Sequence, residues 1–109
     1  MNILIAEDEA QIASSLKKNF NDEGFKALIA ADGEEAFEIY KSNKIDIILL
    51  DWKMPKLTGL EVCKKIRLTD NKVPVILITA LGDISNKVEA LNAGADDYIT
   101  KPFSFEEVY

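Results

Sequence analysis

Five short apolar runs recur along the chain, and segments with a helical spacing of apolar residues separate them. The first, third and fourth runs are almost continuous in Ile, Leu and Val, which is typical of strands buried on both faces of a sheet. We therefore predict five strands. Their expected ranges are Asn2–Ala6, Lys26–Ala30, Ile45–Leu50, Val75–Thr79 and Asp97–Thr100.

Between these runs, apolar residues recur at intervals of three or four, which predicts helices with one buried face. Asp32 and Thr58 each precede a glutamate by three residues, the pattern of a helix N-cap with its capping acid. Gly24 and Gly94 stand where a helix C-terminal glycine is expected. The four apolar stripes are Ile12–Leu16–Phe20, Ala36–Phe37–Tyr40, Leu60–Cys63–Ile66 and Ile84–Val88–Leu91.

Alternation of strands and helices with short crossovers predicts a parallel sheet covered by helices on both faces. The expected fold class is α/β, a doubly wound (βα)5 arrangement in one domain. Ser104-Phe105-Glu106-Glu107 has the pattern of a capping box that begins a fifth helix, and the sequence ends at Tyr109. Helix 5 is therefore expected to be truncated.

Composition and charge narrow the function. Of the 109 residues, 19 are acidic and 13 basic, and the net charge of −6 argues against direct nucleic acid binding. The chain has no histidine, which excludes imidazole bases, histidine-metal sites and serine triads. No apolar stretch approaches the roughly 20 residues of a membrane helix, and no signal peptide opens the chain. With Cys63 as the single cysteine, these features predict a cytoplasmic protein that does not enter the membrane.

Polar residues follow four of the predicted strands at their carboxyl ends, where doubly wound sheets carry their functional sites. Each has a structural explanation when taken alone: a turn aspartate, an acidic first helical turn, a strand-end threonine and a solvated lysine. Their joint placement is poorly explained in that way and predicts a common site. The residues are Glu7-Asp8-Glu9, Asp51, Thr79-Ala80 and Lys101-Pro102.

The chemistry of such a site is specific. Neighbouring carboxylates repel by about 4 kcal/mol per pair at an effective dielectric constant near 20. A hard cation such as Mg²⁺ relieves this repulsion, because it prefers oxygen ligands. The metal and the Lys101 ammonium would then neutralise a phosphoryl group, and the Thr79 hydroxyl would donate to it. Asp51 could serve as the nucleophile and form an acyl phosphate.

These motifs closely resemble the response regulator receiver domains of two-component signalling. The resemblance spans residues 1–109 in order and spacing, apart from the end of helix 5, and implies the flavodoxin-like strand order 2-1-3-4-5. It rests on Glu7-Asp8, Asp51-Trp52-Lys53-Met54-Pro55 with Gly59, Thr79-Ala80 and Lys101-Pro102-Phe103.

The resemblance implies that Asp51 accepts a phosphoryl group from a sensor histidine kinase or a phosphotransfer protein. Direct Mg²⁺ ligands would be Asp8, Asp51 and the Lys53 backbone carbonyl, with Glu7 acting through water. The implied phosphate-binding residues are Thr79, Ala80 and Lys101. Thr79 and Tyr98 would form the conformational switch, and the Lys101–Pro102 bond is expected to be cis.

Residues 87–103 are most similar to the subfamily that carries a winged-helix DNA-binding domain. This similarity implies that Lys87, Asp96 and Asp97 lie on the helix 4–strand 5–helix 5 face used for homodimerisation. The basic partners of these residues normally lie on the missing part of helix 5, which weakens the expectation of a dimer. Transcription would be regulated through a domain absent from this chain.

Three alternatives stay open. A phosphatase of the haloacid dehalogenase type also forms an aspartyl phosphate, but it needs its nucleophile after strand 1 with a second aspartate two residues on. A flavin carrier would need a phosphate loop rich in Ser, Thr and Gly after strand 1. A degenerate receiver could act as an interaction module, although the acid, threonine and lysine set is complete here.

Overall fold

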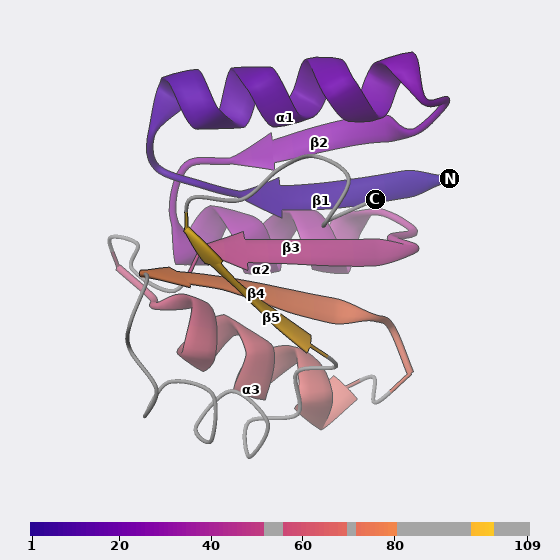
Figure 1. The fold of residues 1–109 in the computed structure, drawn as a ribbon. Helices are drawn as coiled ribbons and strands as arrows, with labels where there is room; N and C mark the ends of the chain where they lie inside the picture. Colours follow the sequence, from indigo (N-terminus) through magenta and orange to yellow (C-terminus); the bar gives the residue numbers. More distant parts are fainter. Residues whose placement is uncertain (52–55, 70–71, 81–96, 102–109) are drawn as a thin grey trace.

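The computed structural model describes residues 1–51, 56–69, 72–80 and 97–101, and for residues 79–80 and 97–101 it describes the backbone alone. The strands are β1 (Asn2–Ala6), β2 (Lys26–Ala30), β3 (Ile47–Asp51), β4 (Val75–Ala80) and β5 (Asp97–Lys101) (Figure 1). The helices are α1 (Ala10–Asp22), α2 (Gly33–Ser42) and α3 (Gly59–Thr69). Within these ranges no helix is long and apolar enough to cross a bilayer.

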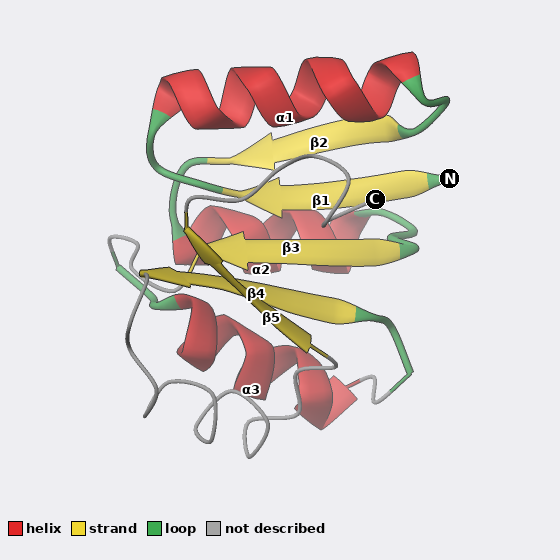
Figure 2. Ribbon diagram, viewed as in Figure 1, coloured by secondary structure: helices red, strands yellow, loops and turns green. Residues whose placement is uncertain are grey.

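The strands form one parallel sheet in the order β2-β1-β3-β4-β5 (Figure 2). The predicted fold class and strand order are therefore confirmed. The predicted fourth helix, Gly94 and the capping box at Ser104 lie outside the described residues.

The third strand begins two residues later than predicted and includes Asp51. Ile45 lies outside it, between Lys44 and Asp46, which are both hydrogen bonded to Asn2. The Asn2 backbone N–H donates to Oδ2 of Asp46 at 2.7 Å, and its side-chain amide donates to the Lys44 carbonyl at 2.7 Å. The regular pairing of β1 with β3 begins only at Ile3 and Ile47.

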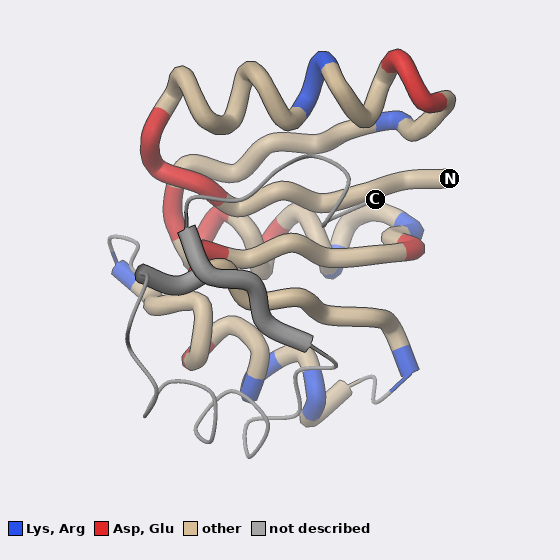
Figure 3. The backbone as a smooth tube through the Cα atoms, in the orientation of Figure 1, with Lys and Arg blue, Asp and Glu red and all other residues tan. Residues whose placement is uncertain are grey.

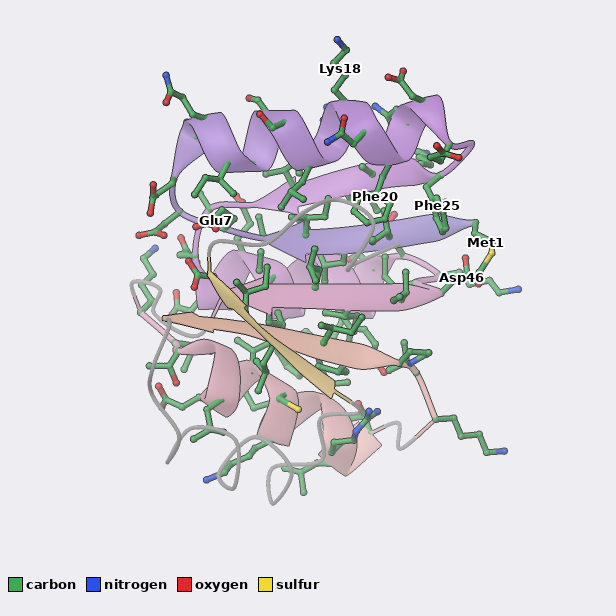
Figure 4. All side chains as sticks on the ribbon, in the orientation of Figure 1. Met1, Glu7, Lys18, Phe20, Phe25 and Asp46 are labelled. Atoms are coloured by element: carbon green, nitrogen blue, oxygen red, sulfur yellow. The ribbon has the colours of Figure 1, made fainter. Side chains whose placement is uncertain are left out.

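Helices cover both faces of the sheet, as the continuous apolar strands predict. On one face, α1 packs Leu16 and Phe20 onto Ile3, Ile5 and the rest of a buried cluster. Phe20 meets Phe25 edge to face, with ring centroids 5.4 Å apart (Figure 4). On the other face, α2 and α3 cover the alternate residues of the same strands. This second cluster includes Leu4, Ala6, Ala36, Ile48, Leu50, Val62, Cys63, Ile66, Val75 and Leu77.

Both predicted N-caps are confirmed. Oδ1 of Asp32 accepts the Glu35 backbone N–H at 2.8 Å at the start of α2. At the start of α3, Oγ1 of Thr58 accepts the Glu61 N–H at 3.2 Å, and the Glu61 carboxylate accepts the Thr58 N–H at 3.0 Å. Gly24, after α1, has a φ of 93°, a conformation that favours glycine.

Candidate functional site

The site is built where β1 and β3 end side by side in the sheet. Ala6 is paired with Leu50, so Glu7 and Asp51 each follow one member of this pair. The chain then leaves β1 for α1 on one face, and it leaves β3 for α3 on the opposite face. In doubly wound sheets the region between such diverging connections is the usual binding crevice, and we call the region around the ends of β1 and β3 the crevice.

Three of the predicted residues come together in this crevice. One carboxylate oxygen from each of Glu7, Asp8 and Asp51 lies within 4.8 Å of the other two. Figure 3 shows acidic positions gathered at this edge of the sheet, and Figure 4 labels Glu7 there, opposite Met1 and Asp46. The three carboxylates therefore place negative charges close together at this edge.

Backbone pairing holds Glu7 in place. Its backbone N–H donates to the Ala30 carbonyl at 3.0 Å, which continues the pairing of β1 with β2 by one residue. Its Oε2 accepts the backbone N–H of Glu9 at 3.2 Å. Glu7 is 2% exposed and Asp51 is 5% exposed, whereas Asp8 is exposed to solvent. Two buried acids and one exposed acid therefore face the crevice.

The three acids after β1 do not form the first turn of a helix. α1 begins at Ala10, Glu9 occupies the N-cap position, and the first turn contains no acidic residue. The structural explanation of Glu7-Asp8-Glu9 as a helix-stabilising acidic turn is therefore wrong. Of these three acids, Glu7 and Asp8 have a carboxylate oxygen in the cluster with Asp51.

Asp51 is held from two sides. Its backbone pairs with Ile78 of β4. Gly59, the first residue of α3, packs against its backbone carbonyl, where any side chain on Gly59 would collide with that group. The phosphoacceptor candidate thus lies at a strand end that is paired with β4 and packed against α3.

The predicted residues of β4 and β5 lie at the same edge in backbone register. Thr79 directly follows Ile78, the partner of Asp51, and Ala80 is paired with Lys101. Tyr98 is paired with Leu77, further inside the sheet. Asp97 begins β5, while Lys53, Lys87, Asp96 and Pro102 lie outside the described residues. The expected Lys101–Pro102 bond and dimer face are therefore not described.

The sequence did not predict a contact between the connection that follows Asp51 and the start of α2. The Lys56 ammonium lies 3.7 Å from Oδ2 of Asp32 and 3.9 Å from Oε2 of Glu34. Lys56 has a φ of 70°, although no glycine or asparagine signals a left-handed residue at this position. The signal that was present is Gly33, the first residue of α2, because glycine is a weak helix former that lets another part of the chain approach closely.

The donor set fits a hard divalent cation. All three clustered side chains offer carboxylate oxygens, which Mg²⁺ and Ca²⁺ prefer over nitrogen or sulfur ligands. The only cysteine of the sequence, Cys63, belongs to α3, is buried in the core and is not part of this donor cluster. A soft metal therefore has no matching ligands in the described crevice.

Comparison with known proteins gives one consistent family. The family model described as "Response regulator receiver domain" matches residues 3–109. The protein named "Response regulator MprA" of Mycobacterium avium (strain 104) is 40% identical over 108 residues, which are 99% of this chain and 47% of that protein. "Probable transcriptional regulator ycf27" of Guillardia theta is 43% identical over 106 residues, 97% of this chain and 41% of that protein. The chain spans about half the length of these relatives or slightly less.

Solved structures agree with the sequence relatives. The Francisella response regulator 1452 receiver domain has a TM-score of 0.92 and 40% identity, over 98% of this chain and 88% of that one. A two-component response regulator from Clostridium difficile has a TM-score of 0.94 and 32% identity, over 100% and 89%. The response regulator TrrA from Thermotoga maritima, solved in complex with Mg(2+)-BeF, has a TM-score of 0.88 and 34% identity, over 98% and 91%.

Proposed function

Because the chain belongs to the response regulator receiver domain family, we propose that it is a signalling switch in which Asp51 accepts a phosphoryl group. The donor would be a sensor histidine kinase or a phosphotransfer protein. The observation that carries this proposal is the buried Asp51 carboxylate at the carboxyl edge of β3, with the Glu7 and Asp8 carboxylates within 4.8 Å. Receiver domains are signalling domains, so turnover of an external substrate is not part of this function.

Mg²⁺ is the proposed cofactor. Asp8, Asp51 and the Lys53 backbone carbonyl would be direct ligands, and Glu7 would act through water. The clustered carboxylate oxygens support this choice, as does the Mg(2+)-BeF complex of the related TrrA receiver. When bound, the cation supplies positive charge that offsets the charge of the transferring phosphoryl group.

The chemical step uses the Asp51 carboxylate as the nucleophile. A carboxylate oxygen forms a bond to phosphorus while the phosphorus–nitrogen bond of the donor phosphohistidine breaks, and the imidazole leaves with the electron pair of that bond. Lys101 would pair with the phosphoryl oxygens, and Thr79 and Ala80 would bind them from the end of β4. Thr79 of β4 and Tyr98 of β5 would then form the conformational switch that responds to phosphorylation.

The output proposed for the whole protein is regulation of transcription by a DNA-binding domain beyond these residues. The relatives named as a response regulator and a transcriptional regulator, both more than twice as long as this chain, support it. A homodimer would use the face of Lys87, Asp96 and Asp97. This segment is proposed to act in the cytoplasm without binding nucleic acid itself, as the excess of acidic over basic residues suggests.

Family membership also weighs against the other functions considered. The haloacid dehalogenase pattern is absent from the residues after β1, which are Glu7-Asp8-Glu9. The proximity of Asp51 to Glu7 and Asp8 favours an active receiver over a degenerate one, because it retains the acids that the chemistry needs.

Incubation with acetyl phosphate and Mg²⁺, followed by mass spectrometry of the intact protein, tests the proposal. We expect one added phosphoryl group on the wild type and none on Asp51→Asn. Asp22→Asn is the matched control, since Asp22 is an exposed residue at the far end of α1 and should be phosphorylated normally. An adduct that persists in Asp51→Asn would overturn the assignment of the acceptor.

A further inference from the structure

The N-terminus of α2 contacts the connection between β3 and α3 at two points. This connection leads from Asp51 to Thr58, the N-cap of α3. Its described end, residues 56–58, lies against the residues that begin α2. None of the residues to which the proposed function assigns a role belongs to α2.

The first contact is steric. A methyl group on Gly33 would lie 2.5 Å from Cβ of Leu57 and 2.7 Å from its carbonyl carbon, and closer still to its carbonyl oxygen. Real Cβ atoms do not approach other atoms to such distances. Two of the three colliding atoms belong to the backbone of Leu57. An added methyl group could therefore be accommodated only if the connection or the start of α2 moved.

The second contact is electrostatic. The Lys56 ammonium lies near both Asp32 and Glu34, at 3.7 and 3.9 Å. Asp32 has a double role, because its other carboxylate oxygen caps α2 through the Glu35 N–H. The exposed ion pairs contribute little energy by themselves. They do, however, join the left-handed Lys56 to the same helix end that Leu57 touches.

These contacts are close to Asp51 along the chain. Only residues 52–55 separate Asp51 from Lys56, and each residue spans at most about 3.6 Å. At the other end, Gly59 packs directly on the Asp51 carbonyl. A displacement of Leu57 would therefore act close to Asp51, through the adjoining residues Thr58 and Gly59.

We propose that the N-terminus of α2 positions the phosphoacceptor site, with Gly33 as the positioning residue that lets the β3–α3 connection pack closely. The inference rests on the function proposed above, because it concerns Mg²⁺ binding and phosphoryl transfer at Asp51. A change at Gly33 should lower the affinity for Mg²⁺ even where the protein stays folded, since precise placement of surrounding groups governs metal affinity.

The test compares Gly33→Ala with Gly24→Ala. Both replace a glycine by alanine, but Gly24 lies at the opposite edge of the sheet and has open space around it. Calorimetric titration with Mg²⁺, well below the melting temperature of each variant, should give a dissociation constant raised about tenfold for Gly33→Ala. Gly24→Ala should lose stability but bind Mg²⁺ as the wild type does.

A second measurement uses the wild type alone. Coupling between two sites is reciprocal, so Mg²⁺ should slow local opening of the α2 N-cap. Hydrogen exchange of the Glu35 amide, which donates to Asp32, should therefore slow when Mg²⁺ is added. The Gly24 amide, which donates to the Asn21 carbonyl, should change less.

Three results would contradict these proposals. A folded Gly33→Ala that binds Mg²⁺ within about twofold of the wild type would overturn the inference. If Gly33→Ala does not fold, unchanged exchange of the Glu35 amide on adding Mg²⁺ would overturn it instead. A wild-type protein that neither binds Mg²⁺ nor becomes phosphorylated would refute the proposed function, and the inference with it.

Discussion

Gly59 packs directly against the backbone carbonyl of Asp51. A methyl group on Gly59 would lie 3.0 Å from the Asp51 carbonyl carbon, closer still to its oxygen, and 3.1 Å from Cδ2 of Leu77. The first turn of α3 therefore meets the end of β3 at a distance that only glycine permits. The position of the phosphoacceptor candidate depends on a residue that brings no chemistry of its own.

Gly59→Ala is expected to destabilise the fold by about 1–3 kcal/mol, the usual cost of overpacking a tight contact. It should also slow phosphorylation by acetyl phosphate, because relief of the collision requires Asp51 or α3 to move. Urea unfolding and intact mass spectrometry measure the two effects. Gly24→Ala is the control, with a cost of about 1 kcal/mol from its positive φ and an unchanged phosphorylation rate. A Gly59→Ala variant as stable as the wild type would contradict the contact.

Asp8→Asn should stabilise the metal-free protein. The carboxylates of Glu7, Asp8 and Asp51 repel one another, and Asp8 is the exposed member, so screening reduces the gain to about 1 kcal/mol. Mg²⁺ at about 100 times its dissociation constant should stabilise the wild type by about 2.7 kcal/mol and Asp8→Asn much less. Urea unfolding with EDTA and with Mg²⁺ measures both. Equal stability of the two proteins in EDTA would mean that these acids do not interact.

Much of the fold was predictable because burial imposes a local pattern. Strands that are covered on both faces are continuous in Ile, Leu and Val, and the capping residues Asp32 and Thr58 lie next to the helices that they begin. Asp51 and Asp8 could be assigned to one crevice because the carboxyl ends of parallel strands share an edge.

The contact between Gly33 and Leu57 could not be predicted in this way. It joins residues 24 positions apart (57 − 33), and it arises only after α2 and α3 have packed side by side on one face. The left-handed backbone of Lys56 could not be predicted either, since lysine has no local preference for that conformation. Tertiary packing determines both the Gly33–Leu57 contact and the Lys56 backbone, and the spacing of apolar residues in the sequence does not indicate either.

The capping box of α3 should make stability depend on pH. Hydrogen bonds from the Thr58 backbone and side chain lower the pKa of Glu61 below its ordinary value of 4.5. A group with a lowered pKa in the folded state stabilises the fold above its unfolded pKa, and this contribution is lost as the pH falls through the folded pKa. Glu61→Gln should thus be less stable than the wild type at pH 7, with a difference that shrinks below pH 4.5. Urea unfolding at several pH values tests this, and a difference that stays constant with pH would contradict it.

Loss of the N-cap itself is a separate prediction. Thr58→Ala removes the hydroxyl that accepts the Glu61 N–H and should cost about 1 kcal/mol. Thr58→Ser keeps an oxygen in the same place and should cost much less. Urea unfolding of the two variants at pH 7 makes the comparison. Equal losses would show that the methyl group of Thr58, and not its hydroxyl, stabilises the start of α3.

The left-handed conformation of Lys56 predicts an unusual order of stability among its variants. Lys56→Ala and Lys56→Gly both lose the ion pairs with Asp32 and Glu34, so the difference between them isolates the backbone. At a φ of 70°, alanine keeps the clash between its Cβ and the following carbonyl group, which costs about 1–2 kcal/mol, and glycine does not. Lys56→Gly should therefore be about 1 kcal/mol more stable than Lys56→Ala, although glycine has the more flexible unfolded chain. Lys41, the next-to-last residue of α2, provides the control: there Lys41→Gly should be less stable than Lys41→Ala, by up to about 1 kcal/mol. The same order at both positions would contradict a left-handed backbone at Lys56.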